Sequence, residues 1–182
     1  MKTDKNVNDA AIAGDMHIDK DAFTPVTLDD YLRVDNLCRD LLLRFYEQLQ
    51  VEGVSPEEAT ALASGADYFI LNFLVDFKGY NLFDERPGIV RQFAGNWYVV
   101  NTLEPEIAHL DLHLRGIAAF YRFLCNHRLI SAGYLKEIEK ECGELAYYES
   151  RIESFWAIEG EGFLSWEKEC TLKEGWSGTG RA

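Results

Sequence analysis

Two histidines and a glutamate lie close together in the stretch PEIAHLDLH, residues 105–113. Glu106 precedes His109 by three residues, and His113 follows His109 by four. Residues three or four apart share one face of a helix, so these side chains can reach a common ligand if the segment is helical. Imidazole and carboxylate are frequent ligands of divalent metal ions. The spacing makes Glu106, His109 and His113 a candidate mononuclear metal site.

The same histidines also have a purely structural interpretation. A ferritin-like di-iron site needs a second Glu-x-x-His sequence, which this chain lacks. His127 would lie about 27 Å from His109 along a continuous helix and cannot join the set. The interpretation that the sequence favours is neutral, mostly buried histidines that hydrogen-bond to neighbouring helices. No cofactor is therefore expected, and a single divalent metal ion is the alternative.

These residues belong to a predicted central helix over residues 104–129. At about 100° per residue, its main apolar face carries Ile107, Leu110, Leu114, Ile117, Tyr121 and Leu124. A second apolar face carries Leu112, Ala119 and Phe123. A helix that is apolar over most of its circumference is buried on most sides.

Four further helices are predicted from apolar residues that recur at spacings of three and four. Their ranges are 27–53, 55–79, 89–101 and 131–158. Thr27 and Ser55 are suitable N-caps for the first two. The predicted fold class is all-α, a single domain of about five helices with an orthogonal or bundle-like arrangement.

The segments outside this domain are polar. Residues 1–26 are acidic and without periodicity, so we expect a mobile N-terminal arm before an all-helical domain over 27–160. Residues 161–182 are expected to form a C-terminal tail, partly packed on the core. No apolar run approaches the roughly 20 residues of a membrane span, and the N-terminus lacks a hydrophobic signal core. We therefore expect a cytoplasmic location and no membrane partner.

The four cysteines are widely separated and form no Cys-x-x-Cys pair. They are Cys38, Cys125, Cys142 and Cys170. Each lies in or near an apolar helical pattern, which favours buried, reduced thiols over disulfides or a zinc site.

The net charge of −13 disfavours nonspecific binding to nucleic acid or to an anionic membrane over most of the surface. The charge is uneven along the chain. Residues 86–128 contain five basic and three acidic side chains, whereas the segments before and after them are strongly acidic. The middle of the chain is thus the one net-positive segment.

Part of the chain resembles a known DNA-binding family. Residues from about 66 to 131 contain YFILNFLVDF, VRQFAGNWYV and LRGIAAFYRFLCNHRLIS. They resemble the helical core-binding (SAM-like) domain of phage-integrase-type tyrosine recombinases, whose last helix typically carries an aromatic-Arg-Phe-Leu segment, here residues 121–124. The catalytic domain of that family has no counterpart in this sequence, so the resemblance does not imply recombinase activity. It implies DNA contacts by Arg86, Arg91, Arg115, Arg122 and Arg128.

Three functional hypotheses follow. The leading one is a non-enzymatic protein-interaction or regulatory module whose partner is another protein, because the sequence shows no Gly-x-Ser-x-Gly or phosphate-binding glycine loop. Its candidate anchors are Tyr80, Phe83, Trp166 and Trp176, since aromatic residues are enriched at interface hot spots. The second is a DNA-binding module that uses residues 86–128. The third is a metal protein or metalloenzyme that uses Glu106, His109 and His113.

Overall fold

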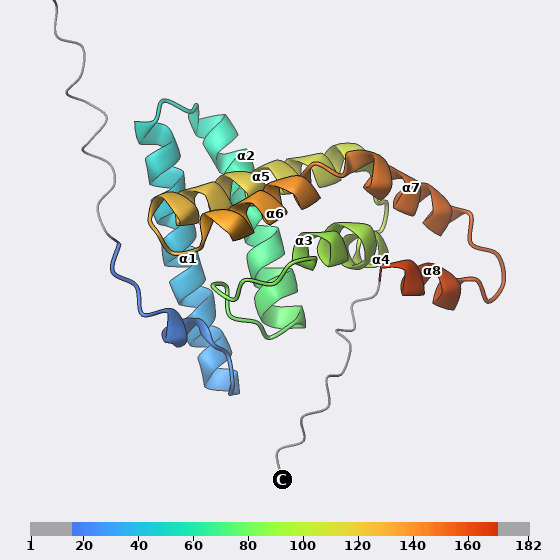
Figure 1. The fold of residues 1–182 in the computed structure, drawn as a ribbon, viewed down its shortest axis with the longest axis horizontal. Helices are drawn as coiled ribbons and strands as arrows, with labels where there is room; N and C mark the ends of the chain where they lie inside the picture. Colours follow the sequence, from blue (N-terminus) through green and yellow to red (C-terminus); the bar gives the residue numbers. More distant parts are fainter. Residues whose placement is uncertain (1–15, 171–182) are drawn as a thin grey trace, which may run out of the picture.

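All regular structure in the computed structural model, which describes residues 16–170, is helical (Figure 1). This confirms the predicted all-α class. Seven helices are present in the described residues, where about five were predicted, if α2–η2 and α3–η3–α4 are each counted as one continuous helix. The difference arises in the C-terminal part of the chain, where one predicted helix is two and a further short helix follows.

The first long helix, α1 (Leu28–Val51), begins where the sequence predicts. The hydroxyl of Thr27 accepts a hydrogen bond from the backbone N–H of Asp30, and the Asp30 carboxylate accepts one from the N–H of Thr27. This reciprocal capping satisfies backbone donors that a helix start leaves free. Its buried residues recur at the helical spacings of three and four by which it was predicted, and they are Val34, Cys38, Leu41, Leu42, Phe45 and Leu49.

The second predicted helix is also confirmed, but its last part is a π-helix. Helix α2 (Pro56–Asp67) is capped by the Ser55 hydroxyl and continues directly into η2 (Tyr68–Phe77). The next helix follows the same scheme: α3 (Ile89–Gln92) and α4 (Tyr98–Asn101) flank the π-helical η3 (Phe93–Trp97). The two π segments face each other through aromatic rings, with Phe73 at 5.5 Å from Phe93 and 5.6 Å from Trp97 between ring centres.

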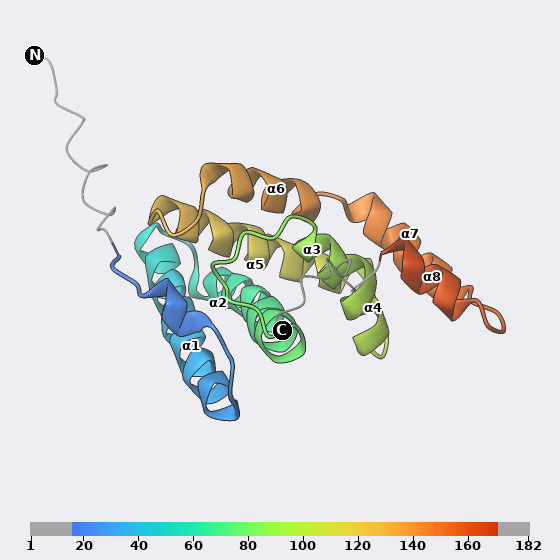
Figure 2. The same ribbon diagram turned by 60° about the horizontal axis from the view of Figure 1, so that its bottom comes forward.

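Helix α5 (Ile107–Asn126) is the predicted central helix. It crosses α2 and lies alongside α6 (Ala132–Cys142), as both views show (Figures 1 and 2). A Cβ atom on Gly116 would lie 2.8 Å from the backbone nitrogen of Ala66 and 3.0 Å from the Cα of Gly65. The two helices therefore approach so closely that glycine is required at the crossing.

The prediction of one continuous helix over residues 131–158 is wrong, because the structure has two helices there. Helix α6 ends at Cys142, directly before Gly143, and α7 (Leu145–Trp156) starts at Leu145 in a new direction (Figure 1). Glycine is a poor helix former, and the break turns α7 so that it packs on η3 and α4. A seven-residue helix, α8 (Phe163–Glu169), then folds back beside α7.

The described part of the predicted mobile arm is packed on the protein. Residues Lys20–Phe23 form a short 3₁₀ turn beside α1 (Figure 2). Phe23 is 3% exposed, and its ring lies 4.8 Å from that of Phe83. The Asn81 amide donates to the carbonyl of Lys20, which fixes the turn to the loop before α3. Residues 1–15 lie outside the described part of the chain.

The four cysteines are free thiols, and the predicted burial holds for three of them. Cys38, Cys142 and Cys170 are buried and Cys125 is half-buried. Burial raises the pKa values of Cys38 and Cys142 to about 12, so both remain protonated thiols at neutral pH. Within residues 16–170, the helices fall short of the length and apolar content needed to cross a membrane.

Candidate functional site

The three candidate metal ligands lie at the start of α5 but in different surroundings. The carboxylate of Glu106 is 3.8 Å from Nδ1 of His109, and both side chains are more than half exposed. His113, one turn further on, is half-buried. Its ring stacks on Tyr68 at 4.7 Å between ring centres. The prediction of mostly buried, hydrogen-bonded histidines is therefore met in part by His113, whose buried Nδ1 has no hydrogen-bond partner, and it is wrong for the exposed His109.

His113 is part of an aromatic cluster. The rings of Tyr98 and Phe93 meet it at 5.7 and 6.3 Å between centres, edge to face. Burial lowers the pKa of His113, because removal from water disfavours the charged imidazolium. Across residues 16–170, no three His, Cys, Asp or Glu side chains gather into a group that could hold a metal ion. Glu106, His109 and His113 are thus not brought together as a ligand set.

Two of the predicted DNA-binding arginines lie beside carboxylates of other helices. Arg122 on α5 forms an ion pair of 2.5 Å with Glu139 on α6. Arg115 lies 3.4 Å from Glu58 on α2 and thus bridges to another helix. The proximity of these carboxylates reduces the positive charge that each arginine presents outward.

Arg86 and Arg91 lie over aromatic rings. The guanidinium carbon of Arg86 is 3.9 Å from the centre of the Tyr80 ring, and that of Arg91 is 4.1 Å from the centre of the Tyr147 ring. Arg91 also lies 3.6 Å from Glu144. Arg128, the fifth candidate, is exposed at the C-terminal end of α5 with a positive φ of 58°.

The predicted aromatic anchors are mostly core residues. Trp166 is 5% and Phe83 9% exposed, and Tyr80 is half-buried. Trp176 lies outside the described residues. The expectation of exposed anchors is therefore wrong for Trp166 and Phe83, because the tail and the loop fold back and cover their apolar rings.

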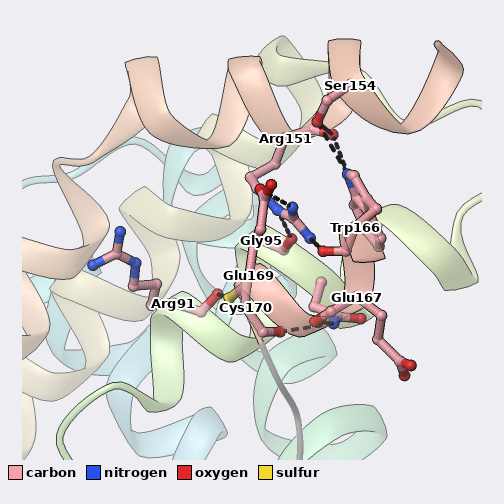
Figure 3. Close-up of polar contacts among 9 residues, drawn as sticks. Arg91, Gly95, Arg151, Ser154, Trp166, Glu167, Glu169 and Cys170 are labelled. Carbon is pink, nitrogen blue, oxygen red and sulfur yellow. Dashed lines mark hydrogen bonds and ion pairs between the residues drawn. The ribbon is translucent and has the colours of Figure 1, made fainter. Parts of the chain in front are cut away.

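A buried arginine that the sequence analysis did not single out holds the C-terminal helices together (Figure 3). The side chain of Arg151, on α7, is 2% exposed. It donates to the carbonyl of Gly95 at 2.9 Å and to that of Trp166 at 2.8 Å, and it pairs with Glu169 at 2.8 Å. One guanidinium group thereby connects α7, α8 and η3. The signal in the sequence was a charged residue on the face that also carries Tyr148 and Phe155.

Further hydrogen bonds tie α8 to its neighbours. The indole N–H of Trp166 donates to the hydroxyl of Ser154 at 3.0 Å (Figure 3). The amide of Asn96 donates to the carbonyl of Cys170 at 2.7 Å, and the thiol of Cys170 donates to the carbonyl of Arg91 at 3.1 Å. Because these partners lie on α7 and on the continuous α3–η3 helix, α8 is fixed from two sides.

A buried carboxylate holds the start of α3. Glu141, on α6, accepts hydrogen bonds from the backbone N–H groups of Gly88, Val90 and Arg91 at 2.6 to 3.0 Å. An anion at a helix N-terminus is stabilised by the free N–H groups and by the helix dipole. No local sequence signal distinguishes Glu141 from the other carboxylates of α6.

Among residues 145–170, one large aromatic side chain is strongly exposed. Trp156 is the last residue of α7 and is 59% exposed. Its ring lies 5.7 Å from that of Phe155, which in turn lies 5.2 Å from Trp166. A chain of ring contacts thus connects the exposed indole through Phe155 to Trp166, on which Arg151 stacks.

Comparison with protein-family models, with curated proteins and with solved structures returned no match. The resemblance to recombinase core-binding domains therefore stays a prediction from the sequence.

Proposed function

We propose that this protein is a non-enzymatic interaction module that binds another protein through the end formed by α7 and α8. The observation that carries this proposal is the exposure of Trp156 at the end of α7. Tryptophan is the residue type most enriched at interface hot spots. A large indole left in water also gives up the free energy that burial of its apolar surface would supply.

The support beneath Trp156 favours a binding role. Its ring contacts that of Phe155, which in turn contacts Trp166, and Arg151 fixes Trp166 by stacking at 3.8 Å and by the hydrogen bonds described above. A side chain presented on a fixed scaffold loses less conformational entropy when a partner covers it.

The charge around Trp156 indicates the kind of partner. Residues 145–170 contain six acidic and two basic side chains, and one of the basic ones is the buried Arg151. Glu149 and Glu153 lie on the same helical face as Trp156, seven and three residues before it. Electrostatic complementarity then favours a basic segment that carries an apolar side chain for the indole.

Affinity capture with three forms of the protein tests this proposal. Wild type, Trp156→Ala and Leu103→Ala are immobilised and exposed to native cell lysate, and the bound proteins are quantified by mass spectrometry. Leu103 is 96% exposed and is the control for loss of an exposed apolar side chain elsewhere. We expect a partner that wild type and Leu103→Ala retain and Trp156→Ala loses. Equal recovery by all three forms would contradict a role for Trp156.

A further inference from the structure

Three leucines of α1 are exposed on one side of the helix. Leu28, Leu32 and Leu43 are 82, 66 and 55% exposed. They are four and eleven residues apart, and both spacings return to nearly the same direction on a helix of 3.6 residues per turn. Exposed leucines aligned along a helix mark a surface that another element can cover.

The stripe runs into a groove between α1 and α2. The groove has a volume of about 320 Å³. Its lining residues are Arg39, Leu42, Leu43, Tyr46, Ala63, Ser64 and Asp67. Leu42 is 6% exposed, so part of the lining is apolar core surface.

The stripe is complementary to itself when its direction is reversed. Along α1 it reads Leu28, Leu32, Asp35, Arg39, Leu43 and Tyr46. From either end, two apolar residues are followed by one charged residue. The two charged residues at the centre, Asp35 and Arg39, have opposite signs. This order is what a two-fold axis requires, because each residue then meets its counterpart on an identical surface.

We infer that this surface is a self-association site, in which a second copy of this chain lies antiparallel along α1 and inserts its Leu28 and Leu32 into the groove. In this arrangement Leu32 of each copy lies near Leu43 of the other. Asp35 of each copy faces Arg39 of the other. Both the apolar contacts and the opposite charges therefore favour a second copy of this chain as the molecule that covers the groove.

The charges at the centre are available for such an exchange. Within one chain, Arg39 pairs with Asp35 at 2.8 Å, and the two side chains are 58 and 36% exposed. Asp67 and Asp76 also act on Arg39, so the cation lies among more carboxylates than it can neutralise. The excess negative charge of the two copies opposes association, and salt should reduce this repulsion.

The surface is separate from the one proposed for the partner protein. Helix α1 and the α7–α8 end lie at opposite ends of the molecule in both ribbon views (Figures 1 and 2). Loss of self-association therefore leaves the Trp156 surface intact, and the two proposals can fail independently.

Sedimentation equilibrium of the full chain tests the apolar part. We expect wild type to show an average mass that rises with concentration toward twice 20.8 kDa. Leu32→Glu should raise the dissociation constant at least about tenfold, because a carboxylate would be taken out of water against Leu43 and near the like charge of Asp67. Leu103→Glu, at an exposed site away from α1, should leave the mass unchanged. A wild-type protein that is monomeric at every concentration would overturn the inference.

A charge exchange tests the register. Asp35→Arg and Arg39→Asp each place like charges at both contacts of a homodimer, so each variant alone should be monomeric. A mixture of the two restores opposite charges at both contacts and should form a heterodimer. Because both sites are on the surface, circular dichroism should show unchanged helix content. Variants that dimerise alone as well as wild type, or a mixture that stays monomeric, would overturn the antiparallel register.

Discussion

The guanidinium carbon of Arg151 lies 3.8 Å from the centre of the Trp166 ring, and the backbone carbonyl of Arg151 accepts a hydrogen bond from the indole N–H of the same tryptophan. The two residues therefore hold each other through the side chain and the main chain of Arg151. Arginine suits this position because its planar guanidinium group can stack on a ring while its N–H groups donate hydrogen bonds within the plane of the guanidinium group. The pair joins α8 to α7. It thereby also holds Trp166 against Phe155, the ring that contacts Trp156.

Replacement of Arg151 should be among the most destabilising changes on α7. Arg151→Met keeps much of the side-chain volume but leaves the carbonyls of Gly95 and Trp166 without their donor. We expect a loss of about 3 kcal/mol in the free energy of unfolding, measured by urea denaturation. Hydrogen exchange of the α8 amides should also become faster.

The matched control for this change is Arg122→Met. Arg122 pairs with Glu139 on the surface, where its side chain is 55% exposed. An exposed ion pair contributes about 1 kcal/mol or less. Similar losses in the two variants would mean that Arg151 acts as an ordinary surface charge.

The crossing of α2 and α5 should not tolerate a methyl group. Gly116→Ala would place its Cβ 2.8 Å from the backbone nitrogen of Ala66 and in contact with the carbonyl of Leu62. Backbone atoms cannot move aside cheaply, so we expect a loss of about 3 kcal/mol or more in a denaturation experiment.

Gly133→Ala is the control for the crossing. The nearest atom to a Cβ at Gly133 is the Ser131 hydroxyl oxygen at 3.8 Å. Alanine is the better helix former in α6, so this change should stabilise the protein by about 0.5 kcal/mol. A neutral Gly116→Ala variant would show that the two helices are further apart than described here.

The capping carboxylate of Glu141 should matter more than its neighbours. Glu141→Gln removes the charge and leaves one acceptor oxygen for three backbone N–H groups. We expect a loss of about 2 kcal/mol, with faster hydrogen exchange at the start of α3. Glu137→Gln, one turn earlier on the exposed side of α6, should change stability little. Equal effects would argue against the capping role.

The buried ring of His113 should make stability depend on pH. Its pKa in the folded protein is lowered from 6.5, so the unfolded chain binds more protons as the pH falls below that value. Unfolding is then favoured at lower pH, and this part of the stability is complete only above about pH 6.5. Because His113 is half-buried, the slope should stay well below the roughly 1.4 kcal/mol per pH unit of one full proton.

Denaturation between about pH 7 and 5.5 measures this dependence. His113→Phe should retain the aromatic packing and flatten the slope. His109→Gln, at an exposed position, should leave most of it in place. An unchanged slope in His113→Phe would assign the pH dependence to another group.

The sequence by itself determined the all-α class and the first four helices, since their signals are local. Thr27 and Ser55 cap the helices that they were predicted to cap. The apolar stripe of α1 and most of the main apolar face of α5 are buried, because helical periodicity records which face of a helix leaves water. The second predicted face of α5 is buried only in part, since Leu112 is 45% exposed. The burial of Cys38, Cys142 and Cys170 follows from the same patterns.

Only the tertiary structure decided which charged and aromatic side chains are buried. Arg151 and Glu141 are charged residues whose burial depends on backbone groups more than 45 residues away in the sequence. Trp166 is covered because α8 folds back on α7, whereas Leu28 and Leu32 stay exposed although their helix is apolar on its other side. Periodicity defines the faces of one helix, but the partner of each face is set by contacts between distant segments, and no local pattern contains them.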